Sequence, residues 1–115
     1  MGYNFNVDKK VVVWLHGEIN VPPFSTGAAE EAFNLIEDLR EGKKLSLPRS
    51  RPMPSIGKRC HELRIQDEHQ TWRIFYRTDA DAIIITEIIA KKTQQTPLSV
   101  INNSKKRLRM YDAED

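Results

Sequence analysis

The chain has one cysteine, Cys60, so it forms neither an intrachain disulfide nor a cysteine-based zinc cluster. It lacks any apolar run near the ~20 residues that a membrane-spanning helix needs. We expect no signal peptide and no myristoylation, because the N-terminus has neither an apolar stretch after its charges nor the required serine or threonine. The three histidines lack metal-ligand spacing, and we expect no metal and no other cofactor. These absences predict a cytoplasmic protein that has no membrane partner.

Acidic residues are missing from one long stretch. Residues 42–61 contain none, although the whole chain is nearly balanced at a net charge of +2. This separation of charge predicts one side that faces a polyanion and another that is solvated or faces a partner. The acid-free stretch carries Lys43, Lys44, Arg49, Arg51, Lys58 and Arg59, and later cations are Lys91, Lys92, Lys105, Lys106, Arg107 and Arg109.

Residues 60–77, CHELRIQDEHQTWRIFYR, predict two strands joined by a polar loop at residues 67–70. If the strands pair symmetrically about this loop, Arg64 lies opposite Arg73 and Glu62 lies opposite Phe75. One face of the hairpin is then a core face, and the other is mostly polar. The core face carries Leu63, Ile65, Trp72, Ile74 and Tyr76, and the polar face carries Glu62, Arg64, Gln66, Thr71, Arg73, Phe75 and Arg77.

The two arginines of the polar face repel each other, whereas a sheet built for stability would pair opposite charges there. Two interpretations fit this arrangement. Either an anion binds between Arg64 and Arg73, or the face is solvated and Glu62 relieves the repulsion.

The N-terminal half predicts a strand and a helix. Residues 10–16, KVVVWLH, are typical of a strand buried on both faces, hence a central one. Ser25 or Thr26 caps an amphipathic helix that ends at Gly42. Three prolines and a glycine make residues 43–58 an irregular basic loop, which either contacts substrate or is merely mobile. The apolar stripe of the helix is Ala29, Ala32, Phe33, Ile36 and Leu39.

The C-terminal half predicts a second central strand and a final helix. Residues 82–90, AIIITEIIA, are β-branched on both faces. Thr96 and Pro97 are the cap and first residue of a helix that runs to about Tyr111. We therefore expect one α+β domain over residues 1–115, with about four mainly antiparallel strands, helices on one face and the other face open. The stripe of the last helix is Leu98, Ile101, Leu108 and Tyr111.

Three strings, CHELRI, TWRIFYR and IIAKKTQQTP, occur in this order on the expected elements. With them the chain resembles the HigB-like, phage-derived branch of the RelE/ParE toxin superfamily, from about residue 11 to residue 111. The resemblance implies a RelE-like fold and the toxin half of a type II toxin–antitoxin pair. It also implies an mRNA interferase that cleaves mRNA on the ribosome and is neutralised by a cognate antitoxin, expected to be a small helix-turn-helix protein.

The resemblance places basic site residues at Arg64, Arg73 and Lys92. Some RelE-type toxins use a tyrosine or histidine near the C-terminal helix, and residues 96–99 of this chain contain neither. Two alternatives therefore stay open. One is a ParE-like toxin that inhibits DNA gyrase, and the other is a non-catalytic module of the same fold that only binds nucleic acid or an antitoxin.

Metal-independent RNA cleavage needs a base for the attacking 2′-hydroxyl, cations for the phosphate and a proton for the leaving oxygen. Arg64 and Arg73 suit the phosphate, because a guanidinium fork matches its oxygens. Lys92, with Lys91 beside it, completes a cationic rim. Glu62 is the candidate base, and an ion pair with one of the two arginines explains it equally well.

Four other side chains have two explanations each or no visible chemistry. His61 is expected to point toward the core face, where a packed or hydrogen-bonded histidine is favoured over a catalytic one. His69 at the hairpin tip either contacts RNA or is solvated, and nothing near His16 suggests chemistry. Phe75 either stacks on a base or is buried under the long loop. The expected RNA-binding surface is Lys43, Lys44, Arg49, Arg51, Lys58, Arg59, His69, Phe75, Arg77 and Lys91.

Overall fold

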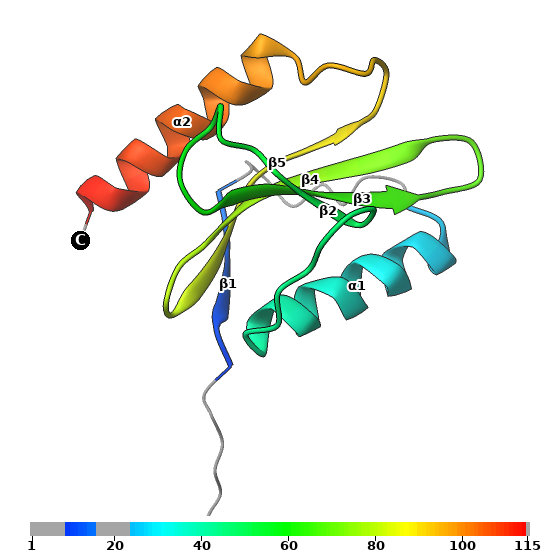
Figure 1. Cartoon of the computed structure of the whole chain (residues 1–115), viewed down its shortest axis with the longest axis horizontal. Helices are drawn as coiled ribbons and strands as arrows, with labels where there is room; N and C mark the ends of the chain where they lie inside the picture. Colours follow the sequence, from blue (N-terminus) through cyan, green and yellow to red (C-terminus); the bar gives the residue numbers. More distant parts are fainter. Residues whose placement is uncertain (1–8, 16–23, 115) are drawn as a thin grey trace, which may run out of the picture.

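A computed structural model describes residues 9–15 and 24–114. These residues form β1 (Val11–Trp14), α1 (Thr26–Arg40), β2 (Ser50–Pro52), β3 (Cys60–Gln66), β4 (Thr71–Thr78), β5 (Ala82–Ala90) and α2 (Leu98–Ala113). The strands make one five-stranded sheet in the order β1-β5-β4-β3-β2 (Figure 1). β1 runs parallel to β5, and the other neighbours are antiparallel. The expected α+β class is confirmed, and the fold is RelE-like.

The β3–β4 hairpin has the register that the sequence predicts. Arg64 lies opposite Arg73, and Glu62 lies opposite Phe75. The amide of Asp67 donates to the carbonyl oxygen of Gln70 at 2.8 Å, which closes the loop. The expected core face is confirmed, and its five residues Leu63, Ile65, Trp72, Ile74 and Tyr76 are all buried.

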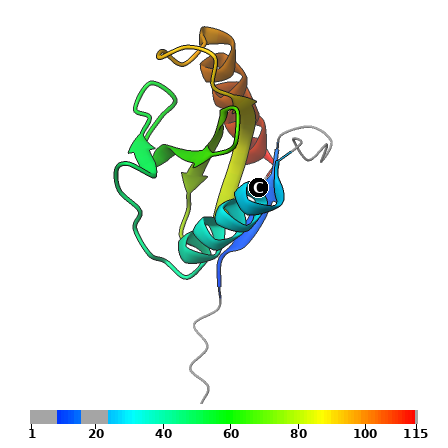
Figure 2. The same cartoon turned by 90° about the vertical axis from the view of Figure 1, so that its right-hand side faces the viewer.

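The two helices cover opposite faces of the sheet, as Figures 1 and 2 show. Leu35 of α1 packs on the side to which Ile83 points, and Leu108 of α2 packs on the side of Ile84 and Phe75. The expectation that both helices share one face and leave the other open is therefore wrong. The physical reason is that the inner strands are apolar on both sides, since Ile83 and Ile84 are both 0% exposed. Such strands need a cover on each face.

The edges of the sheet differ from expectation. β1 is an edge strand rather than a central one, because its neighbour is β5 alone in the described sheet and Val11 is 57% exposed. β2 is a short strand inside the segment expected to be irregular. Its Pro52 is tolerated because an edge strand needs no donor on its outer side. His16 lies outside the described residues.

Helix α1 begins and ends where the sequence predicts. The Ser25 hydroxyl accepts a hydrogen bond from the Ala28 amide at 3.1 Å, which caps the first turn. Gly42 follows the last turn at φ 86°, a left-handed conformation that glycine adopts without steric cost. The predicted stripe is wrong at Ala29, which is exposed, and at Phe33, which is 62% exposed, because the buried face instead contains Ala28 and Leu35.

Helix α2 starts at Leu98 with Pro97 before it, and no side chain caps its first turn. The Thr96 hydroxyl, expected to be that cap, instead accepts a hydrogen bond from Arg73. The predicted stripe is wrong at Leu98, which is 69% exposed, whereas Val100 is buried. Neither helix in the described part of the chain is long and apolar enough to cross a bilayer.

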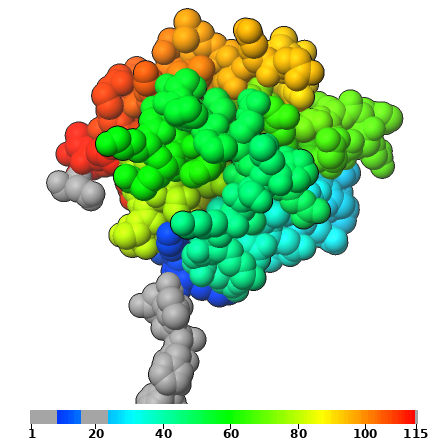
Figure 3. Space-filling model, in the orientation of Figure 1, coloured from blue at the N-terminus to red at the C-terminus, as the bar shows by residue number. Residues whose placement is uncertain are grey.

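The segment between α1 and β3 closes the front of the molecule. In the space-filling view its green atoms lie between α2 in orange and α1 in cyan (Figure 3). Met53 and Ile56 from this segment are buried against Phe75 and Leu108 on the α2 side of the sheet. The polar face of the hairpin is therefore largely enclosed.

Candidate functional site

A cluster of charged side chains lies on the α2 side of the sheet, where neighbouring strands bring it together. Arg51 of β2 lies opposite Glu62 of β3, and Arg64 lies opposite Arg73 of β4. Alternation along β3 puts Glu62 and Arg64 on the same face. The Nε atom of Arg73 donates to Oε2 of Glu62, and the Nε atoms of Arg51 and Arg64 lie 3.4 and 3.5 Å from Oε1. We call these four residues the Glu62 cluster.

Positive charge exceeds negative charge in the Glu62 cluster, because three guanidinium groups surround one carboxylate. Glu62 and Arg73 are 0% exposed, whereas the side chains of Arg64 and Arg51 are 25% and 38% exposed. Arg64 Nε and Arg73 Nη1 are buried and have no hydrogen-bond partner in the described part of the protein. A cluster with surplus charge and unused donors is suited to bind an anion such as a phosphate.

Two further contacts fix the orientation of Arg73. Its guanidinium carbon lies 5.2 Å from the ring centroid of Phe75, within range of a cation–π interaction. Its Nη2 donates to the Thr96 hydroxyl at 2.6 Å. Sequence reasoning missed Thr96 as a partner of Arg73, because nothing in the pattern of residues 91–97 shows which way that loop folds.

A bulge in β5 adds a second polar pair to this face. The register between β4 and β5 shifts between Phe75 and Tyr76, so both Thr86 and Glu87 face α2. The Thr86 hydroxyl lies 2.8 Å from the Ser104 hydroxyl, and Arg107 Nη1 lies 3.2 Å from Glu87 Oε2. Sequence reasoning placed Arg107 among the C-terminal cations but not in this contact, since a bulge is invisible to strict alternation.

Two residues of the expected RNA-binding surface make contacts inside the protein instead. Phe75 is 0% exposed and packs under Met53 and Ile56, so burial under the long loop is confirmed and stacking on a base is not available to it. Arg77 donates to both Asp79 and Asp112, with distances of 2.8 to 3.0 Å. Its contact with Asp112 connects β4 to the end of α2.

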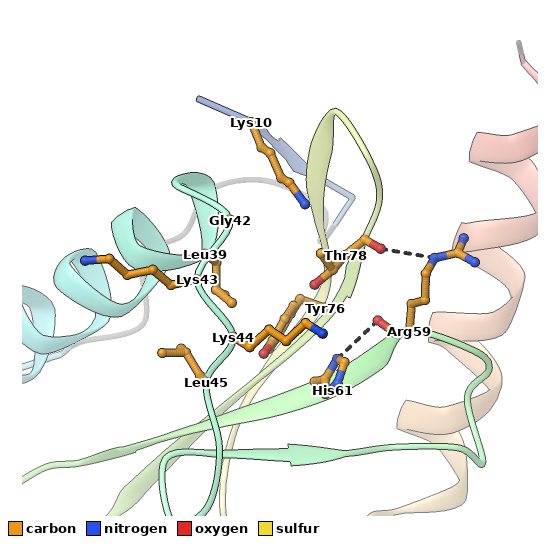
Figure 4. A pocket seen from close by; sticks show the side chains of 10 residues that line it. All are labelled: Lys10, Leu39, Gly42, Lys43, Lys44, Leu45, Arg59, His61, Tyr76 and Thr78. Atoms are coloured by element: carbon orange, nitrogen blue, oxygen red, sulfur yellow. Dashed lines mark hydrogen bonds between the residues drawn. The ribbon is translucent and has the colours of Figure 1, made fainter. Parts of the chain in front are cut away.

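The acid-free segment divides between the two faces of the sheet. Arg51 belongs to the Glu62 cluster, but Lys44 and Arg59 line a pocket together with His61 and Tyr76 on the α1 side (Figure 4). The segment therefore does not extend one continuous cationic patch. Lys43 forms ion pairs with Asp38 and Glu41.

The remaining predicted residues are more accessible. Arg49, Lys58, His69 and Lys92 are exposed, with the His69 side chain 92% exposed at the hairpin tip. Lys91 is half-buried, and its amide donates to the carbonyl oxygen of Thr71 at 2.7 Å. Their contact with RNA stays a prediction.

His61 is packed and hydrogen-bonded, as expected. Its ring stacks on Tyr76 at a centroid distance of 5.4 Å, and Nδ1 lies 3.2 Å from the carbonyl oxygen of Arg59. Burial raises the pKa of the Cys60 thiol, which makes this cysteine a poor nucleophile. Across residues 9–15 and 24–114, no three His, Cys, Asp or Glu side chains come together in a group that could hold a metal ion.

The fold is RelE-like, and the sequence comparison names the family. The family model described as phage derived protein Gp49-like (DUF891) matches residues 23–109, which is more than half of the chain. The chain therefore belongs to the Gp49-like family, a family of HigB-like toxins. Membership implies an antitoxin as a partner. Neither a curated protein nor a solved structure gives a significant match.

Proposed function

We propose that this protein is the toxin of a type II toxin–antitoxin pair and an endoribonuclease that cleaves mRNA on the ribosome. The observation that supports the proposal is the Glu62 cluster, in which three guanidinium groups share one carboxylate. Two of their donors have no hydrogen-bond partner in the described chain. A phosphate beside the accessible side chains of Arg51 and Arg64 would balance the surplus charge.

The reaction proposed is an attack of the RNA 2′-hydroxyl on the adjacent phosphorus, with cleavage of the bond to the 5′-oxygen. Negative charge builds up on the phosphate oxygens in the transition state. Guanidinium groups fixed in advance stabilise that charge without having to reorganise, which is a large contribution in acyl and phosphoryl transfer. Arg64 and Arg51 are the accessible members of the cluster, and Arg73 forms its floor. Lys92 is exposed and is proposed to complete the cationic rim.

Glu62 is a positioning residue in this proposal rather than the general base. Its carboxylate is 0% exposed and already accepts a hydrogen bond from Arg73. A base must reach the proton that it removes, directly or through one water. The Glu62 carboxylate instead holds the three guanidinium groups near one point.

The partner proposed is a small helix-turn-helix antitoxin, in line with membership of a HigB-like toxin family. An antitoxin that neutralises the toxin must prevent contact between the Glu62 cluster and RNA. Coexpression with the product of a neighbouring gene is therefore expected to restore growth.

The test is inducible expression of the chain followed by primer extension on a reporter mRNA. Arg64→Ala removes an accessible guanidinium and leaves the buried Arg73–Glu62 pair in place. We expect it to reduce mRNA cleavage at least about 100-fold, because a missing transition-state donor typically costs this much. Arg109→Ala removes an exposed arginine of α2 outside the cluster and is the matched control.

Undiminished cleavage by a folded Arg64→Ala variant would contradict the assignment of the site. DNA damage signalling without loss of mRNA would instead indicate a ParE-like gyrase inhibitor. A chain without toxicity would indicate a module that only binds an antitoxin or nucleic acid, an alternative favoured by the complete burial of Glu62 and Arg73.

A further inference from the structure

A second cationic cavity lies on the α1 side of the sheet, on the face opposite to the Glu62 cluster. We call it the α1-side pocket. It has a volume of about 480 Å³, within the range of ~300–1,000 Å³ that small-ligand sites occupy. Its walls come from the residue before β1, the end of α1 with the segment after it, and adjoining ends of β3 and β4 (Figure 4).

Two lysines supply uncompensated positive charge to the α1-side pocket. Both line the pocket, and Figure 4 shows the ammonium group of Lys44 beside His61 and that of Lys10 directed toward Thr78, at the other end of the pocket. Neither ammonium group forms an ion pair with another described residue, and no acidic side chain lines the pocket. Like-charged groups that converge on one cavity without a counter-ion attract an anion.

The other two cations at the pocket are already used. Lys43 points away and pairs with Asp38 and Glu41 at 3.3 and 3.4 Å. The Arg59 side chain also points away, and its Nε donates to the Thr78 carbonyl oxygen at 3.1 Å. Binding of an anion would therefore depend on Lys10 and Lys44 but not on Lys43.

The remaining walls of the pocket are planar and apolar. The His61 ring stacks on Tyr76, which is 2% exposed, so His61 presents its ring at the surface and Tyr76 backs it. Leu39 and Leu45 complete an apolar wall. A flat aromatic surface beside two ammonium groups is complementary to a nucleobase joined to a phosphate, because aromatic rings stack on bases and ammonium groups pair with phosphates.

We propose that the α1-side pocket binds a nucleoside phosphate, with the phosphate between Lys10 and Lys44 and the base against His61. The compact cavity with one planar wall favours this ligand over an acidic peptide, which would need a long groove and repeated cations. The site lies across the sheet from the Glu62 cluster and does not depend on the proposed RNA cleavage. The phosphate can belong to a free nucleotide or to the end of an RNA strand.

The test is calorimetric titration of the full chain with each of the four 5′-nucleoside monophosphates, and with inorganic phosphate and adenosine as the separate halves of the ligand. We expect at least one monophosphate to bind more tightly than either half.

The variants test which side chains bind the phosphate. Each of the two substitutions Lys44→Ala and Lys10→Ala is expected to weaken binding about tenfold, which corresponds to the loss of one close ion pair. Lys43→Ala, a neighbouring lysine that points away, is the matched control and should change the affinity less than about twofold. Lys106→Ala should leave the affinity unchanged, because Lys106 is an exposed residue of α2, which covers the other face.

A second arm identifies the source of the phosphate. Short oligoribonucleotides with a 5′-phosphate or a 5′-hydroxyl are titrated in the same way. Binding of the 5′-phosphorylated strand alone, lost in Lys44→Ala, supports the site and assigns it to a strand end, whereas binding of a monophosphate assigns it to a free nucleotide. The proposal is overturned if none of these ligands binds, if Lys43→Ala and Lys44→Ala behave alike, or if polyglutamate alone binds the pocket.

Discussion

Glu62 sits at the centre of the charged cluster and has no exposed surface. Burying a carboxylate costs several kcal/mol, and nearby cations with hydrogen bonds must offset that cost. Arg73 is buried with it and donates to it, and Arg51 and Arg64 contribute from 3.4 and 3.5 Å. The same carboxylate therefore relieves the repulsion between Arg64 and Arg73 that their register imposes.

Glu62→Gln keeps the shape of the side chain and removes its charge. Three guanidinium groups would then repel one another with no counter-ion, and Arg73 would be a buried unpaired charge. We expect the free energy of unfolding to fall by about 3 kcal/mol, as measured by urea denaturation.

Glu68→Gln is the control, because the Glu68 side chain is 79% exposed at the hairpin tip. Its effect should stay within about 0.5 kcal/mol. Equal stability of the Glu62→Gln variant and the unaltered protein would show that the Glu62 carboxylate is not the counter-ion of the cluster.

At the scale of elements, Asp67 joins the hairpin tip to the start of α1. Its Oδ2 accepts hydrogen bonds from the Ser25 amide at 3.0 Å and from Trp72 Nε1 at 2.9 Å. Its Oδ1 accepts one from the Glu68 amide at 2.8 Å. Hydrogen bonds from Ser25, and then from Trp72 and Glu68, hold the pKa of the Asp67 carboxyl well below its usual range.

A lowered pKa in the folded state means that the ionised carboxylate stabilises the fold. This stabilisation is complete above the usual aspartate pKa of about 4 and is lost as the pH falls below it toward the folded value. We expect the Tm of the unaltered protein to fall more steeply between about pH 5 and about pH 2.5 than the Tm of Asp67→Asn, which cannot ionise. Scanning calorimetry across this range measures both slopes.

Asp81→Asn is a suitable control, because Asp81 is exposed in the turn between β4 and β5. The Tm of Asp81→Asn should fall with decreasing pH as steeply as the Tm of the unaltered protein. If the Tm of Asp67→Asn and the Tm of the unaltered protein fall equally steeply, the ionised carboxylate of Asp67 does not stabilise the fold.

At the scale of the whole molecule, the sheet is covered on both sides. One hydrophobic cluster lies under α1, and a separate one lies between the sheet, α2 and the segment that carries Met53 and Ile56. The cationic hairpin face is thus an internal face with an accessible margin at Arg51 and Arg64, rather than an open floor.

Two leucines of the stripe predicted for α2 differ in burial. Leu108 is 6% exposed in the α2-side cluster, and Leu98 is 69% exposed. We expect Leu108→Ala to lower the free energy of unfolding by about 3 kcal/mol, because it leaves a cavity in the core. Leu98→Ala should change it by less than about 0.5 kcal/mol, and similar losses in urea denaturation for both variants would contradict the observed face of α2.

The sequence predicted much of the candidate site. Alternation with period two gave both the pairing of Arg64 with Arg73 and the face that they share with Glu62, and the structure has the same register. It did not give Arg51 as the third arginine around Glu62, because the prolines beside Arg51 hid the edge strand β2. Nor did it give Thr96 as a partner of Arg73, since that contact depends on the path of the β5–α2 loop.

The sequence by itself determined the local features of this protein: the hairpin register, a cap at Ser25 or Thr26 and the glycine that ends α1. These depend on neighbours along the chain or across one tight loop, so the residue pattern is sufficient. Only the tertiary structure decided which face each helix covers, that β1 is an edge strand, and that Lys44 and Arg51 lie on opposite sides of the sheet. The reason is that the inner strands are apolar on both faces. An amphipathic helix would find an equally suitable surface on either one, and only the packing of the whole chain distinguishes them.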